Sequence, residues 1–94
     1  MSMKTIRLIG GLRVLMGTKT IPVDVDPEAT VRDLLHTIQR DYPRLAARIL
    51  LDDDQPDPDV LIAVNGSSVS LLHGLDTSLA GLDEVILIPP LIGG

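Results

Sequence analysis

The feature that most constrains the fold of this chain is one amphipathic helical stripe set among strand-like segments. Four apolar residues at i, i+3, i+4 and i+7 make the stripe: Val31, Leu34, Leu35 and Ile38. Thr30 precedes them as a candidate N-cap, and Asp33 stands at the capping-box position. Pro43 disfavours helical backbone at the residue before it, so the helix is predicted over residues 30–41. Pro43 can also open a second, short helix over residues 44–50.

Two strand patterns precede this helix. Residues 4–9 alternate so that Arg7 and Ile9 share one face, opposite to the more apolar face. Residues 20–25 also alternate, and Pro22 within them indicates an edge strand or a bulge. The segment between the two strands is punctuated by glycines and is predicted to be the long loop of a hairpin.

The segments after the helices predict further strands. Residues 60–65 form an apolar run that ends at Asn65-Gly66, a strong turn signal. The last apolar run, over residues 85–88, is typical of a central strand. The remaining segments are predicted as an acidic loop over 52–59, a short partner strand over 68–72, and a loop over 74–83 that turns Leu75 and Leu79 into the core.

Together these elements predict an α+β fold, with a mixed sheet of four to five strands, one main helix and a short second helix. The first and last strands are expected to be a central parallel pair, because the helix between them can cover the crossover. The 94 residues suit a single domain, and the core must be aliphatic because Tyr42 is the sole aromatic residue. The strand residues expected beneath the helix are Ile6, Leu8, Val23, Ile62, Val64, Val85 and Leu87.

Composition excludes several classes of function. A net charge of −5 argues against nucleic-acid and anionic-membrane partners, which require a surplus of Lys and Arg. The chain has no cysteine, no signal-peptide pattern and no apolar stretch of membrane-spanning length, so a cytoplasmic protein is expected. The acidic segment 52–59 lacks the glycine and glutamate of a calcium loop, and no metal site is predicted. Because no nucleophile–base pair stands out, no catalytic residue is predicted, and the chain resembles a substrate more than an enzyme.

The C-terminal segment offers the clearest functional signal. It reads Pro89-Pro90-Leu91-Ile92-Gly93-Gly94. The two prolines favour an extended path, and the two glycines have no side chains to obstruct a narrow channel. The segment therefore suits a tail whose terminal carboxylate is itself the reacting group, with a simple frayed terminus as the alternative.

Several motifs occur in order and extend over nearly the whole chain. They are Leu12-Arg13-Val14-Leu15-Met16-Gly17, Thr30-Val31-Arg32-Asp33-Leu34-Leu35, Val64-Asn65-Gly66, Asp83-Glu84-Val85 and the terminal Pro-Pro-x-x-Gly-Gly. Together they resemble the MoaD/ThiS family of ubiquitin-like sulfur carriers. The resemblance implies a β-grasp fold and an E1-like adenylating enzyme as partner. That enzyme would use ATP to adenylate Gly94, and sulfur would then replace AMP to give a thiocarboxylate. Gly93, Ile92 and Leu91 would pass through the partner's channel, and the chain itself would bind no cofactor.

The resemblance also implies a sulfur-accepting synthase, of which the chain could be the small subunit. The sulfur could serve molybdopterin, thiazole, tRNA or amino-acid biosynthesis. Leu91-Ile92 replaces the small residue often found before the glycines, and the segment 71–76 looks longer than in compact molybdopterin-synthase subunits. One alternative is a protein modifier joined to lysines through Gly94, although Lys4 and Lys19 are the only lysines available for self-chains. A second alternative is a non-covalent interaction module.

One face of the predicted sheet has no helix to cover it. Strand alternation places Ile9, Ile86 and Ile88 on this face, and Val69 and Leu71 are expected to join them. A contiguous apolar group beside a reactive tail predicts a docking surface for the activating enzyme. The alternative is that a loop or a second copy of the chain covers these side chains.

Overall fold

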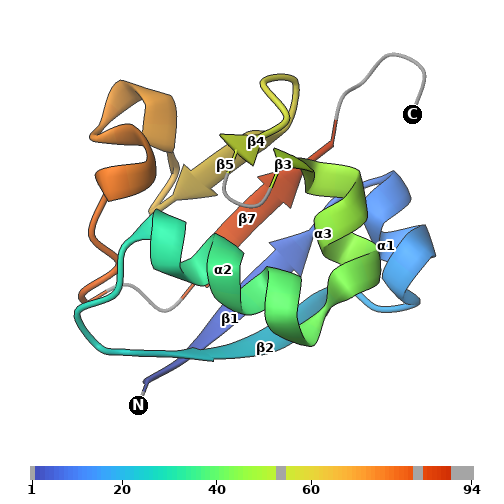
Figure 1. Ribbon diagram of the computed structural model, residues 1–94, viewed down its shortest axis with the longest axis horizontal. Helices are drawn as coiled ribbons and strands as arrows, with labels where there is room; N and C mark the ends of the chain where they lie inside the picture. The colour runs from blue at the N-terminus through green and yellow to red at the C-terminus, as the bar shows by residue number, and fades with distance from the viewer. Residues whose placement is uncertain (1, 53–54, 82–83, 90–94) are drawn as a thin grey trace.

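A helical layer lies across one face of a five-stranded sheet in the computed structural model, which describes residues 2–52, 55–81 and 84–89 (Figure 1). The helices are α1 (Gly11–Met16), α2 (Val31–Asp41) and α3 (Pro43–Ile49), with 3-10 turns η1 (Val69–Leu71) and η2 (Gly74–Asp76). The main sheet contains β1 (Ser2–Leu8), β2 (Thr20–Val25), β5 (Leu61–Val64), β6 (Ser67–Ser68) and β7 (Glu84–Ile88). A separate two-stranded sheet pairs β3 (Leu50–Asp52) with β4 (Gln55–Pro56).

The order of the strands confirms the predicted topology. The main sheet runs β2-β1-β7-β5-β6, so β7 is its central strand. β1 and β7 are parallel, with Ile6 opposite Val85. β2 lies at an edge of the sheet, where Pro22, which has no backbone N–H, is not required to donate a hydrogen bond to a second neighbouring strand. β5 and β6 form the predicted hairpin, whose turn residues Asn65 and Gly66 both have positive φ, as a type I′ turn requires.

The core lies between α2, α3 and the sheet and is aliphatic, as predicted. The four residues of the α2 stripe are fully buried, and so are their partners on the sheet. The predicted strand residues Ile6, Leu8, Val23, Ile62, Val64, Val85 and Leu87 all belong to this buried cluster. Tyr42 packs at its margin, and its hydroxyl donates to the Pro22 carbonyl at 2.6 Å, which ties the end of α2 to the edge strand.

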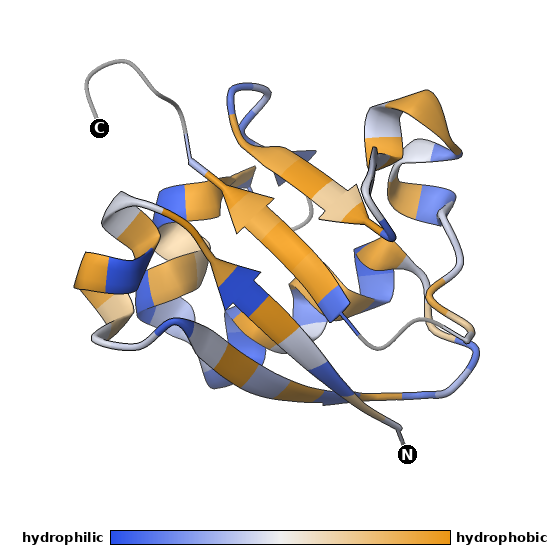
Figure 2. Cartoon of the chain, turned by 180° about the vertical axis from the view of Figure 1, so that it is seen from behind, coloured by the Kyte–Doolittle hydropathy of each residue, from blue (hydrophilic) through white to orange (hydrophobic). Residues whose placement is uncertain are grey.

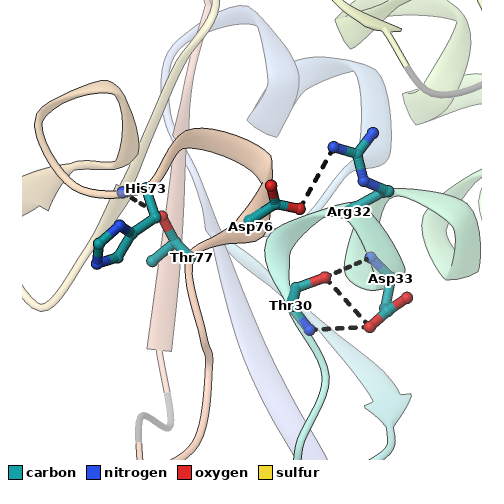
Figure 3. A network of polar contacts seen from close by, with 6 residues as sticks. All are labelled: Thr30, Arg32, Asp33, His73, Asp76 and Thr77. Carbon is teal, nitrogen blue, oxygen red and sulfur yellow. Dashed lines mark hydrogen bonds and ion pairs between the residues drawn. The ribbon is translucent and has the colours of Figure 1, made fainter.

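Polar contacts fix the start of α2 and join it to the loop 74–81 (Figure 3). The predicted capping box is present: Thr30 Oγ1 accepts from the Asp33 amide, and Asp33 Oδ2 accepts from the Thr30 amide. Arg32 Nη2 lies 3.4 Å from Asp76 Oδ1 in η2. The Val31 amide also donates to the Thr77 carbonyl at 3.0 Å, so the helix start and the loop form one unit.

Lys4 is buried on the core side of β1. Its side chain shares the face of Ile6 and is only 3% exposed. Nζ donates to the Leu79 carbonyl at 2.9 Å, and Leu79 is itself fully buried as predicted. One of the two lysines of the chain is therefore enclosed, whereas Lys19, just before β2, is exposed.

Three predictions about local structure were wrong. The connection between β1 and β2 contains the helix α1, which buries Leu12 and ends at Gly17 in the left-handed conformation. The acidic segment forms part of the β3–β4 pair, as far as its residues are described. The strand expected over 68–72 stops at Ser68, whose hydroxyl caps the 3-10 turn that follows. The two helices after β2 begin and end within one residue of their predicted limits.

Candidate functional site

The base of the C-terminal segment is fixed against the end of β1. Pro89 is the last described residue, and Leu91, Ile92, Gly93 and Gly94 lie outside the described residues. The Ile9 amide donates to the Leu87 carbonyl at 3.2 Å, which extends the parallel pairing beyond β1. A Cβ placed on Gly10 would lie 3.6 Å from Pro89 Cγ, so Gly10 packs beside the point where the segment leaves the sheet.

The backbone of Gly10 is one that other residues rarely adopt. Its φ is 58° and its ψ is −129°, whereas the neighbouring Gly11 is the first residue of α1. We expect Gly10→Ala to lower the free energy of unfolding by about 1–3 kcal/mol, because a Cβ strains this conformation while meeting Pro89 only at ordinary contact distance. Gly11→Ala is the matched control, since its Cβ would meet nothing and alanine favours a helix. Urea denaturation checks both variants, and equal stabilities would contradict the strain.

The sheet face opposite to α2 and α3, here called the uncovered face, carries an apolar patch. Figure 2 views the molecule from this side and shows β5 and β7 side by side, both coloured mainly as hydrophobic. The register places Leu61 opposite Ile88 and Ala63 opposite Ile86. These four residues are the apolar patch, and Arg7 lies opposite Ile86 on the other side of β7. Leu61 is 42% exposed and both isoleucines are half-buried, whereas Ala63 is buried.

The residues predicted for docking do not all lie together. Ile86 and Ile88 lie on the uncovered face, and Ile9 follows β1 directly and is half-buried. Val69 was misplaced: it is 7% exposed and belongs to the core, because the chain turns into η1 and directs this side chain inward. Leu71 is 80% exposed, but it lies in η1 and not on a strand of the sheet.

Comparison with known proteins identifies the family. The model of the ThiS family matches residues 6–94. The chain belongs to the ThiS family. Small archaeal modifier protein 3 of Haloferax volcanii is 37% identical over 89 residues, which cover 95% of this chain and 96% of that protein. A putative sulfur carrier protein of Archaeoglobus fulgidus is 32% identical over 73 residues, 77% of this chain and 83% of that one.

Solved structures agree with the assignment to the ThiS family. The crystal structure of SAMP1 from Haloferax volcanii matches with a TM-score of 0.82 at 31% identity, covering 99% of this chain and 100% of that one. The ThiS-family chain therefore has the ubiquitin-like β-grasp fold, which confirms the resemblance and the α+β class expected from its sequence. Within the described ranges, no helix has the length and apolar character needed to cross a membrane.

Two members of the apolar patch of this ThiS-family chain were missed from the sequence. Leu61 and Ala63 belong to an unbroken apolar run, in which alternation between faces cannot be seen. The two-residue turn at Asn65-Gly66 sets the register, but it places serines opposite both faces, with Ser67 opposite Val64 and Ser68 opposite Ala63. The sequence therefore gives no signal that separates the two faces of this run.

Proposed function

We propose that this chain is a sulfur carrier that is activated at its C-terminal glycine. An E1-like partner joins the Gly94 carboxylate to AMP, using ATP and releasing pyrophosphate. A sulfur donor then attacks the acyl carbon, AMP leaves, and a thiocarboxylate forms. The observation that carries the proposal is membership of the ThiS family, whose model matches this chain through residue 94 and so includes the Pro-Pro-x-x-Gly-Gly segment.

The chemistry explains which part of the reaction the chain supplies and which part its partner supplies. A carboxylate is a poor electrophile, whereas an acyl-adenylate carries a good leaving group, so activation must precede sulfur transfer. This chain contributes the acyl group and, through Gly93, a narrow approach to it, while Ile92 and Leu91 follow into the partner's channel. The partner contributes ATP binding and catalysis, so the chain is the substrate of an enzyme and binds no cofactor of its own. We propose that this activity takes place in the cytoplasm, where ATP is available.

The apolar patch is the surface that we propose for docking to the activating enzyme. Leu61 and Ile88 pair across β5 and β7, and Ile88 is followed directly by Pro89 at the base of the C-terminal segment. Apolar side chains that are desolvated on binding are the usual anchors of a protein interface. A patch at this position would hold the chain while the segment beyond Pro89 enters the partner.

The test of the proposal is the intact mass of the protein purified from its own host without reducing additives. We expect a fraction of the chain to carry sulfur in place of one oxygen at Gly94. Incubation of that fraction with a sulfur-accepting synthase should discharge it. Molybdopterin synthesis, thiazole synthesis, tRNA thiolation and amino-acid synthesis are the four acceptor reactions to compare. Carboxylate alone, in cells grown under demand for each of these products, would contradict sulfur carriage.

Protein conjugation is a second candidate, favoured by the names of two relatives. Small archaeal modifier proteins 3 and 1 of Haloferax volcanii are 37% and 33% identical to this chain. Conjugation would use the same acyl-adenylate, with the amine of a target lysine as the nucleophile in place of sulfur. Expression of a tagged chain in its host tests for conjugation: a ladder of tagged bands indicates conjugation, and a single band argues against it.

If the ladder includes chains joined to one another, we expect the branch at Lys19. Lys4 is enclosed and its Nζ is bonded to the Leu79 carbonyl, whereas Lys19 is exposed beside an open groove. Lys19→Arg should therefore remove the bands that contain two copies of the chain and leave conjugates to other proteins. Peptide mapping of the joined chains checks the site, and a branch on Lys4 would contradict the expectation.

A further inference from the structure

Charge is unevenly distributed along the chain. Residues 1–19 contain four of the eight Lys and Arg residues and no Asp or Glu, so all 13 acidic residues lie beyond them. The N-terminal segment is therefore strongly basic in a chain whose net charge is −5. Such segregation produces a directional field that a uniform surface of the same net charge would not have.

The fold gathers the exposed part of this positive charge on one side of Pro89 and the end of β7. Lys4 is buried, but Arg7, Arg13 and Lys19 are exposed. Arg13 and Lys19 line a groove of about 520 Å³ together with Gly10, the residue that packs beside Pro89. Arg7 lies on the uncovered face next to Ile86. None of the three forms an ion pair with another described residue, so their charge is available to a partner.

Negative charge lies on the other side of the end of β7. Because Leu61 pairs with Ile88, the connection that precedes β5 lies next to the end of β7. This connection carries Asp57 and Asp59, and Asp57 Oδ1 accepts from the Asp59 amide at 2.9 Å. A bond from the Asp57 amide to the Ile49 carbonyl at 2.8 Å holds the connection against the end of α3. In Figure 1 this β4–β5 connection and α1 lie on opposite sides of the end of β7.

We propose that these two rims, Arg13 with Lys19 and Asp57 with Asp59, orient the chain on the activating enzyme. The enzyme would present acidic side chains to the Arg13–Lys19 rim and basic side chains to the Asp57–Asp59 rim, around the entrance that receives the C-terminal segment. This inference rests on the proposed function. It adds a rotational constraint, because two rims of opposite sign define one orientation of the chain about the axis of β7, which an apolar patch on one face defines less sharply.

A protein fits these rims better than a nucleic acid does. A polyanion attracted by Arg13 and Lys19 would meet Asp57 and Asp59 across the base of the same segment, within a chain that is acidic overall. Phosphate backbones present one sign of charge, and they bind surfaces with a surplus of Lys and Arg. A protein surface can present both signs at the required spacing.

The test compares two double variants with the same change in net charge. Arg13→Glu with Lys19→Glu reverses the basic rim, and Arg40→Glu with Arg44→Glu reverses two exposed cations on α2 and α3. Association with the host's E1-like enzyme is followed by stopped-flow fluorescence at low and high salt. We expect the first variant to associate roughly tenfold more slowly at low salt, with a difference that disappears at high salt, while the second stays near wild type. Circular dichroism confirms the fold of each, and the glutamine pair replaces any glutamate pair that fails to fold.

Three outcomes would overturn the inference. If both variants slow association equally, net charge alone matters; if neither does, the rims do not contact the enzyme. If the first variant loses affinity for total tRNA while binding the enzyme normally, the basic rim serves a polyanion. ATP–pyrophosphate exchange with the wild-type chain is measured in parallel. If the wild-type chain supports exchange but the first variant associates at the normal rate, only this inference is wrong. If the wild-type chain does not support exchange, the proposed function is wrong, and this inference with it.

Discussion

Deleting Gly94 is expected to abolish ATP–pyrophosphate exchange with the activating enzyme while leaving the domain as stable as before. Adenylation requires a carboxylate at one position in the partner's active site, and a chain one residue shorter would present its carboxylate short of that position. The described core is built from residues between Ile6 and Leu87, and a glycine has no side chain to add to it, so the stability of the domain should not depend on Gly94. The measurements are exchange with labelled pyrophosphate and a thermal melt of the same preparation.

A lengthened chain tests the same requirement for the position of the carboxylate. One alanine added after Gly94 keeps every native residue and moves the carboxylate too far, so exchange should again be lost. A chain lacking Gly94 that still supports exchange would show that the chemistry does not take place at this residue. Loss of exchange together with a lower melting temperature would instead indicate a role for the terminal segment in stability.

The helices after β2 were predictable because local signals there agree with the tertiary structure. The apolar stripe of α2 is continuous, its capping box is complete, and Pro43 separates it from α3. Each signal acts within a few residues of the chain, so it can be recognised before the fold is known. The central position of β7 was predictable for a similar reason, since a strand with neighbours on both sides is typically a continuous apolar run, and β7 is apolar from Val85 to Ile88.

The helix α1 was missed because its stabilisation is not local. Six residues are too few to show a helical period, and two glycines at its start argue against a helix. The element is held by the burial of Leu12 in the core and by the left-handed Gly17, whose amide donates to the Arg13 carbonyl at 2.8 Å. Of these, only the C-terminal glycine could have been recognised from the sequence.

The docking surface was only half predictable. The alternation of β7 placed Ile86 and Ile88 on the uncovered face, whereas Val69 was assigned to it on the assumption that the strand after the Asn65-Gly66 turn continues. Ser68 ends that strand, because its hydroxyl accepts from the Ser70 amide and starts a 3-10 turn. A side-chain bond of this kind competes with the ladder of the sheet, and the spacing of apolar residues does not reveal which of the two forms.

Replacing Ile88 with aspartate is expected to weaken binding to the activating enzyme by roughly thirtyfold or more. Ile88 adjoins Leu61 in the apolar patch and precedes Pro89, so a docked partner would desolvate it. A buried anchor of this kind contributes about 2 kcal/mol or more, which corresponds to that loss of affinity, and an aspartate would in addition lose its hydration. Calorimetric titration of the folded variant against the enzyme measures the effect.

Two further variants show whether the effect belongs to the patch. Leu61→Asp changes the more exposed partner of Ile88, so it should weaken binding in the same direction with a smaller risk to the fold. Leu71→Asp places the same charge on an exposed leucine of η1, outside the patch, and should bind like wild type. Because both variants exchange a leucine for an aspartate, a difference between their affinities for the enzyme reflects only the position of the residue. Normal binding by folded Ile88→Asp and Leu61→Asp would place the docking surface elsewhere, and weakened binding by Leu71→Asp alone would move it to the η1 side of the sheet.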